Sequence, residues 1–113
     1  MSRVEVARHV AADPASVALL LAELAAEDGT DHGLVVTSPR RAGIGFAARL
    51  EFVHAGGAVL VGEIVVAPSS GEGCDVRAGF GVPDDSPIQP VERGASAFLA
   101  ALAAHAKSRA FAA

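Results

Sequence analysis

Three consecutive segments of the chain have the apolar patterns of β-strands, and only short turns separate them. In residues 44–54 every second residue is apolar, residues 59–67 are apolar on both faces, and residues 74–82 alternate again. Alternation with a period of two is typical of β-strands. The connections, Ala55-Gly56-Gly57 and residues 68–73, are too short for the crossover that parallel strands require. The three segments therefore predict an antiparallel meander, which constrains the fold more than any other feature of the sequence.

The first of these turns also predicts a register. If His54 lies opposite Ala58, every inward residue meets an inward residue: Phe52 faces Leu60, Ala48 faces Ile64 and Phe46 faces Val66. The same register places Arg49 opposite Glu63, and the next turn brings Arg77 beside Glu63. We expect this Arg49–Glu63–Arg77 cluster to be a solvated cross-strand ladder on the outer face of the sheet rather than a site.

A strand and a helix precede the meander. Valine alternates with mostly polar residues in residues 4–10, which predicts a strand. Asp13-Pro14 is typical of a helix start, with Asp as the N-cap and Pro at the first helical position. Apolar residues then follow at helical spacing, at Val17, Leu20, Leu21 and Leu24. Residues 34–37 predict a short second strand.

The chain closes with a long alanine-rich helix over about residues 91–110. Its core stripe is expected to hold Val91, Ala95, Phe98, Leu102 and His105. The expected order is β-α-β-β-β-β-α, with about five strands. The fold class is therefore α+β, in a single domain over residues 1–113.

Composition excludes several classes of protein. With 51% hydrophobic and 19% charged residues the chain is not a disordered tail. The net charge is −4 and the basic residues are scattered, which argues against nucleic acid as a partner. Glu23 interrupts the longest apolar run, and acidic residues precede it, so we expect neither a membrane span nor a signal peptide but a soluble cytoplasmic protein. One cysteine and no histidine pair at ligand spacing indicate no disulfide and no metal.

The element order and several short motifs resemble the START-like or Bet v 1-like superfamily, also called SRPBCC or the polyketide cyclase/dehydrase and lipid transport group. Residues 4–17 are similar to the family opening, in which an alternating strand ends in a small-residue step and a Pro before the helix. Residues 43–46 and 73–76 resemble its strand starts, and residues 98–102 fit its closing helix. Ala18 stands where the family commonly has Trp, and one or two strands are missing, so the chain resembles a shortened member.

The resemblance implies a helix-grip fold, in which a curved antiparallel sheet wraps around the long C-terminal helix. It also implies that a small hydrophobic molecule binds in a cavity between the sheet and this helix. We expect a binding protein rather than an enzyme, with no cofactor, and assign no catalytic residue. The candidate pocket residues are Arg8, Phe46, Leu50, Phe52, Ile64, Phe80, Phe98, Leu102 and His105.

Two of these candidates are polar. Arg8 is in phase with the inward valines and would fix a carboxylate or phenolate of a ligand; the interpretation we favour is that the strand bulges there or that Arg8 extends outward at the end of the sheet. His105, on the core stripe, would act as an acid or base at the cavity mouth; a partly buried histidine near a helix end is the more common arrangement. Cys74 is in phase with the core and is expected to be a buried, inert thiol.

Three alternatives stay open. A polyketide cyclase or aromatase would use Arg8 and His105 as polar guides in an open cavity. A close-packed interior would instead favour a homodimeric interaction module without a ligand, joined through the exposed strand edge of the shortened sheet. A cone-shaped fold resembling the nuclear transport factor 2 family has similar elements, but that family opens with helices and this chain with a strand.

Overall fold

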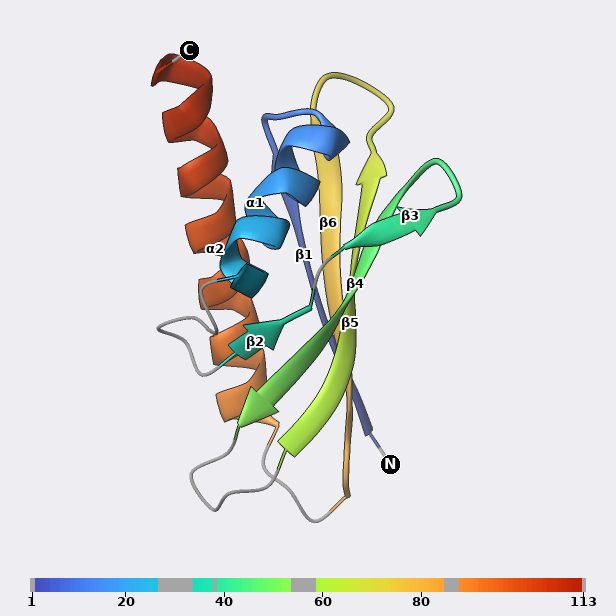
Figure 1. The fold of residues 1–113 in the computed structure, drawn as a ribbon. Coiled ribbons are helices and arrows are strands. Elements are labelled where there is room, and N and C mark those ends of the chain that lie inside the picture. The colour runs from blue at the N-terminus through green and yellow to red at the C-terminus, as the bar shows by residue number, and fades with distance from the viewer. Residues whose placement is uncertain (1, 27–33, 38, 54–58, 85–87, 113) are drawn as a thin grey trace.

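The computed structural model describes residues 2–26, 34–37, 39–53, 59–84 and 88–112. Within these residues the chain forms one six-stranded antiparallel sheet and two helices (Figure 1). The elements in chain order are β1 (Ser2–Val10), α1 (Pro14–Ala26), β2 (Leu34–Val36), β3 (Arg40–Ala42), β4 (Gly45–Val53), β5 (Val59–Pro68), β6 (Cys74–Val82) and α2 (Gln89–Ala112). The sheet order is β1-β6-β5-β4-β2, and β3 also pairs with β4.

The α+β class, the open curved antiparallel sheet and the closing helix are confirmed, but the strand count is higher than expected. The additional strand, β3, runs back onto the start of β4, so that Ala42 lies opposite Gly45. The turn between them consists of Gly43, whose φ is +58°, and Ile44. Ile44 is 83% exposed. The prediction that it begins the apolar face of the strand was therefore wrong, because the strand begins one residue later.

The predicted register between β4 and β5 is confirmed over the described residues. Phe46 pairs with Val66, Ala48 with Ile64, Phe52 with Leu60 and Arg49 with Glu63. The pair His54 and Ala58, from which this register was counted, lies outside the described residues. Inward residues therefore meet inward residues along the whole hairpin, as the burial of both strands requires.

The predicted Arg49–Glu63–Arg77 cluster is correct in the Arg49–Glu63 register but wrong in its third member and in its ion pairs, because Gly79 lies opposite Glu63 and Arg77 lies opposite Val65. Arg49 reaches Glu51 on its own strand, at 3.3 Å between Nη2 and Oε1. Glu63 contacts Arg40 of β3 at 3.6 Å, and Arg77 contacts Glu5 of β1 at 3.3 Å. These side chains are exposed, and their long stems reach neighbours that strand register alone does not identify.

Both helices cover the same face of the sheet, which leaves the opposite face without a helix (Figure 1). Helix α1 begins where the sequence predicts, and the carbonyl oxygen of Asp13 accepts hydrogen bonds from the N–H groups of Ser16 and Val17. Helix α2 buries a long stripe against the sheet. The core contains residues from every layer: Val4, Val10, Val17, Leu20, Leu21, Val36, Ala48, Leu50, Phe52, Leu60, Ile64, Val66, Cys74, Val76, Ala78, Phe80, Val82, Val91, Ala95, Phe98, Leu99, Leu102 and Ala106.

We call the helix-covered side of the sheet the inner face and the opposite side the outer face. Odd-numbered residues of β1, β4, β5 and β6 lie on the outer face, because they alternate with even-numbered residues, most of which are buried. In the part of the chain that the structure describes, neither helix is long and apolar enough to cross a membrane.

Candidate functional site

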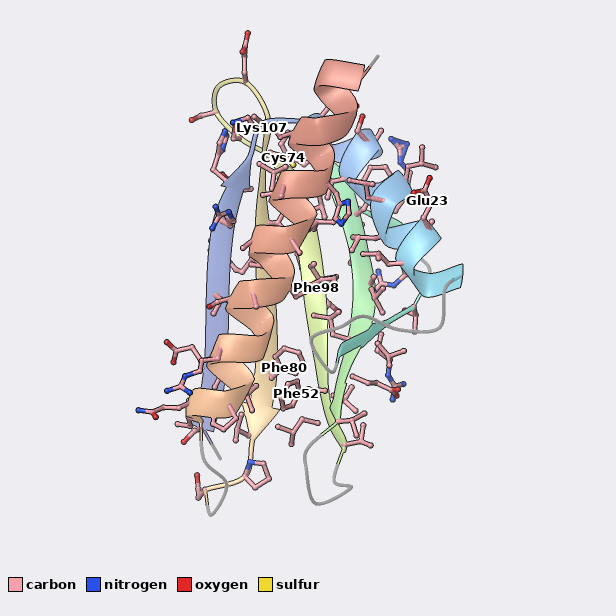
Figure 2. The ribbon with its side chains drawn as sticks, turned by 90° about the vertical axis from the view of Figure 1, so that its left-hand side faces the viewer. Glu23, Phe52, Cys74, Phe80, Phe98 and Lys107 are labelled. Carbon is pink, nitrogen blue, oxygen red and sulfur yellow. The ribbon has the colours of Figure 1, made fainter. Side chains whose placement is uncertain are left out.

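The apolar pocket candidates belong to the hydrophobic core. Leu50, Ile64, Phe80, Phe98 and Leu102 are each at most 2% exposed, whereas Phe46 is half-buried against them. The rings of Phe52 and Phe80 meet edge to face, with centroids 6.5 Å apart. Figure 2 shows both rings, with Phe98, between α2 and the sheet. The expected pocket lining is thus made of side chains that pack against one another.

The polar candidates lie at the surface. Arg8 is in register with the buried Val76, so the strand alternation places it on the inner face as predicted. Its side chain is nevertheless exposed, and it belongs to β1, the end strand of the sheet. The exposure of Arg8 fits the interpretation that its side chain extends outward rather than into the interior.

His105 is exposed, so the prediction that it joins the core stripe of α2 was wrong. After Phe98 and Leu102 the buried position is Ala106, four residues further on. A helix repeats every 3.6 residues, so the next buried residue after Leu102 can follow at a spacing of three or of four. In α2 the spacing is four, which buries Ala106 and leaves His105 exposed.

A hollow of about 460 Å³ lies over β1, β6 and β5, mostly on the outer face of the sheet. We call it the outer hollow; it is lined by Ala7, Arg8, His9, Val65, Ala67, Asp75, Val76 and Arg77. Two cross-strand rows build it. Arg77 lies between Ala7 and Val65, and Asp75 lies between His9 and Ala67. Small side chains at Ala7 and Ala67 beside longer ones leave the space.

The polar groups of the outer hollow come from β1 and β6. The Nδ1 atom of His9 lies 3.1 Å from Oδ1 of Asp75, directly across the two strands. The Nε atom of Arg77 lies 3.3 Å from Oε1 of Glu5, which also contacts Arg3. Arg8 lies at the rim, and among the described residues no carboxylate is within ion-pair distance of it. The hollow therefore holds two guanidinium groups and an imidazole above a floor of valine and alanine, and of these Arg77 already contacts Glu5 and His9 already contacts Asp75.

This arrangement suits a small anion with an apolar portion. A guanidinium presents parallel N–H donors that match a carboxylate or phosphate. The Asp75 carboxylate, which would repel such an anion, already accepts a partner in His9. Among the described residues, no three His, Cys, Asp or Glu side chains are grouped so that they could hold a metal ion.

Cys74 lies next to this site in sequence but points the other way. It is fully buried on the inner face, as predicted. Burial, followed by the charges of Asp75 and Asp13, raises the pKa of the thiol to about 11. The thiolate, which is the reactive form, is therefore disfavoured, consistent with an inert thiol.

The strand alternation in the sequence puts His9 and Arg77 on the outer face. It did not predict that β1 and β6 are neighbours, and so it did not predict the contact of His9 with Asp75 beside Arg77. The contact between His9 and Asp75 joins residues 66 positions apart. It depends on the pairing of β1 with β6, which no turn connects. The signal that existed was the strand alternation, which puts His9, Asp75 and Arg77 on one face once that pairing is known.

No family model and no curated protein matches the sequence. Among solved structures, the chain is similar to the crystal structure of protein CV1439 from Chromobacterium violaceum, a structural genomics target. The two chains are 22% identical, the TM-score is 0.54, and the match covers 94% of this chain and 98% of that chain. The likeness concerns the fold.

Proposed function

We propose that this protein is a binding protein for small anionic molecules with an apolar portion, and that the outer hollow is its binding site. The observation that carries the proposal is the placement of Arg8 and Arg77 beside the His9–Asp75 pair in a hollow of about 460 Å³. Ligand sites in proteins commonly have volumes of this order, with apolar walls and a few polar groups.

The START-like helix-grip assignment also remains a proposal, supported by the element order and by a curved sheet with α2 along its inner face. A ligand in the interior, as that family implies, would have to displace buried side chains such as Phe80 and Phe98. The outer hollow requires no such displacement. For this reason we place the ligand there.

A cyclase or aromatase has less support than a binding protein. The two polar guides of that hypothesis, Arg8 and His105, are both exposed, on β1 and on α2. Binding in the outer hollow is expected to be weak, because its charged groups are exposed to water. Small ligands that gain about 0.3 kcal/mol per non-hydrogen atom bind with dissociation constants of roughly a millimolar or above.

The test is a titration with benzoate, followed by the amide signals of the ¹⁵N-labelled protein in NMR spectra. Benzamide, which has the same shape without the charge, is the matched ligand control. We expect saturable shifts at the amides of residues 7–9, 65–67 and 75–77 with benzoate and weaker shifts with benzamide. Replacing Arg77→Gln should weaken benzoate binding roughly five-fold, since a charge-assisted pair is lost.

The matched protein control is Arg49→Gln, which removes an exposed guanidinium from the same face but outside the hollow. It should leave benzoate affinity within about two-fold of the original. Equal responses to benzoate and benzamide, or equal effects of the two variants, would refute the anionic site. Shifts concentrated around Phe98 and Leu102 would instead place the ligand in the interior and overturn the proposal.

A further inference from the structure

The outer hollow contains a histidine, His9, which belongs to the one type of side chain that ordinarily changes charge between about pH 5 and 8. Its Nδ1 atom lies 3.1 Å from Oδ1 of Asp75, and the two residues are paired across β1 and β6. Both side chains are more than half exposed, at 55% and 62%, so water and protons reach them. The charge of this pair therefore depends on pH.

The geometry identifies the nitrogen of His9 that takes up the proton. An ionised carboxylate only accepts hydrogen bonds, so the Nδ1 atom that faces Asp75 carries a hydrogen in both states of the ring. The proton gained at lower pH therefore goes to Nε2. A Cβ atom added at Gly73 would lie 3.0 Å from this nitrogen, so the absence of a side chain at Gly73 leaves Nε2 uncovered on that side.

Protonation of His9 changes the net charge around the outer hollow. With a neutral imidazole, the charged residues of the lining are Arg8, Arg77 and Asp75, which together carry a net charge of +1. Glu5, which contacts Arg77 from outside the lining, brings this sum to zero. A protonated His9 raises the sum to +1. An anion in the hollow is therefore attracted more strongly when His9 is charged.

The other charged groups around His9 are carboxylates, guanidinium groups and one ammonium group. Groups of these types ordinarily titrate outside the range of histidine. The other histidine of the described residues, His105, is on α2, which packs against the opposite face of the sheet. In the part of the chain that the structure describes, the charged groups near His9 are Arg8 on β1, Asp75 and Arg77 on β6, Glu72 before β6, Asp13 after β1 and Lys107 on α2.

The spacing of the two rows sets the size of the effect. Asp75 and Arg77 are two residues apart on β6, which corresponds to about 7 Å along a strand. An anion held by Arg77 therefore lies about 7 Å from the row of His9 and Asp75. At this separation in water, one unit charge changes the affinity for a monovalent anion roughly three-fold. Salt screens exposed charges, so the effect is largest at low ionic strength.

We propose that the His9–Asp75 pair regulates the outer hollow by pH, so that the hollow binds anions more tightly when His9 is protonated. This inference rests on the proposed function, because it requires an anion in the hollow. The sign follows from the charge alone: proton uptake adds a positive charge beside the ligand, so affinity rises as the pH falls. By linkage, an anion that binds there also favours the protonated form of His9.

The test repeats the benzoate titration at low ionic strength at about pH 5.5 and about pH 8, on either side of the range in which histidine ordinarily titrates. Benzoate is a carboxylate and is ionised at both values. We expect the natural chain to bind benzoate roughly three-fold more tightly at the lower pH. At about pH 6.5, added benzoate should also move the NMR signals of the His9 ring toward their protonated positions.

Three variants separate the charge of this pair from the charge of the whole chain. The chain has four histidines, so its net charge of −4 also rises at lower pH. His9→Gln should bind benzoate with nearly equal affinity at the two pH values. His105→Gln, which removes a histidine on α2, should keep the three-fold difference. Asp75→Asn should bind benzoate roughly three-fold more tightly than the natural chain at about pH 8, because a negative charge leaves the hollow.

The outcomes distinguish this inference from the proposed function. Equal binding of benzoate at both pH values, a pH dependence that His9→Gln retains, or no gain of affinity in Asp75→Asn would overturn the inference and leave the anionic site standing. A pH dependence that His105→Gln also abolishes would belong to the net charge of the chain and would overturn the inference as well. Benzoate that binds at neither pH would overturn both proposals.

Discussion

At the scale of single residues, Gly62 shows how one missing side chain shapes the core. It lies on the inner face of β5, between Leu50 of β4 and Phe80 of β6. A Cβ atom added there would lie 2.6 Å from Cδ1 of the Phe80 ring and would also clash with the carbonyl oxygen of Gly79. The Phe80 ring therefore occupies the space that a side chain at Gly62 would need.

Replacing Gly62→Ala should lower the free energy of unfolding by about 1–3 kcal/mol, because the core must shift to admit the methyl group. Gly71→Ala is the matched control, since nothing lies within 4 Å of a Cβ there. Its effect should stay within about 0.5 kcal/mol. Urea denaturation measures both, and equal stabilities of the two variants would contradict the role given to Gly62.

Cys74 leads to a prediction about alkaline pH. Its pKa is raised from 9.0 to about 11, chiefly by burial, so the folded protein holds the thiol proton more tightly than the unfolded chain does. Its contribution to stability is therefore fully present below pH 9 and is lost as the pH rises toward 11. The loss is on the order of 2 kcal/mol.

This dependence should be visible because the chain has no tyrosine and only one lysine, Lys107. Denaturation measured from pH 8 to pH 11 should show falling stability in the natural chain and a much flatter curve in Cys74→Ala. If both proteins lose stability in parallel, another group is responsible.

At the scale of elements, α2 contributes through one stripe of its surface. Phe98 is 2% exposed and packs in the common core, whereas His105 is exposed two turns further along.

The alternation of β4 and β5 predicted their register because a short turn joins them. β3 escaped prediction because its three residues, Arg40–Ala42, carry no alternating apolar pattern.

The stripe is tested by truncating one residue on it and one beside it. Phe98→Ala should cost about 3–5 kcal/mol of stability, the usual penalty for removing a buried aromatic ring. His105→Ala should change stability by less than about 0.5 kcal/mol. Thermal unfolding followed by circular dichroism measures the difference. A comparable loss in His105→Ala would mean that the stripe turns toward His105 after all.

At the scale of the whole molecule, the placement of both helices on one face decides where function is sought. The inner face is filled by the core, and the outer face carries the outer hollow. Figure 1 shows both helices on one side of the sheet. The benzoate titration examines the outer face, where a ligand would not have to displace the core.

The sequence alone determined both helices and every strand except β3, the hairpin of β4 and β5, and the inward or outward side of most strand residues. These follow from periodicity and from turns, which are local properties of the chain. Only the tertiary structure decided that β1 pairs with β6, which brings His9 to Asp75 and leaves Arg8 at an open edge. It also decided which residues of α2 are buried. The face that α2 turns toward the sheet depends on contacts with strands far away in the sequence, and no local pattern encodes these contacts.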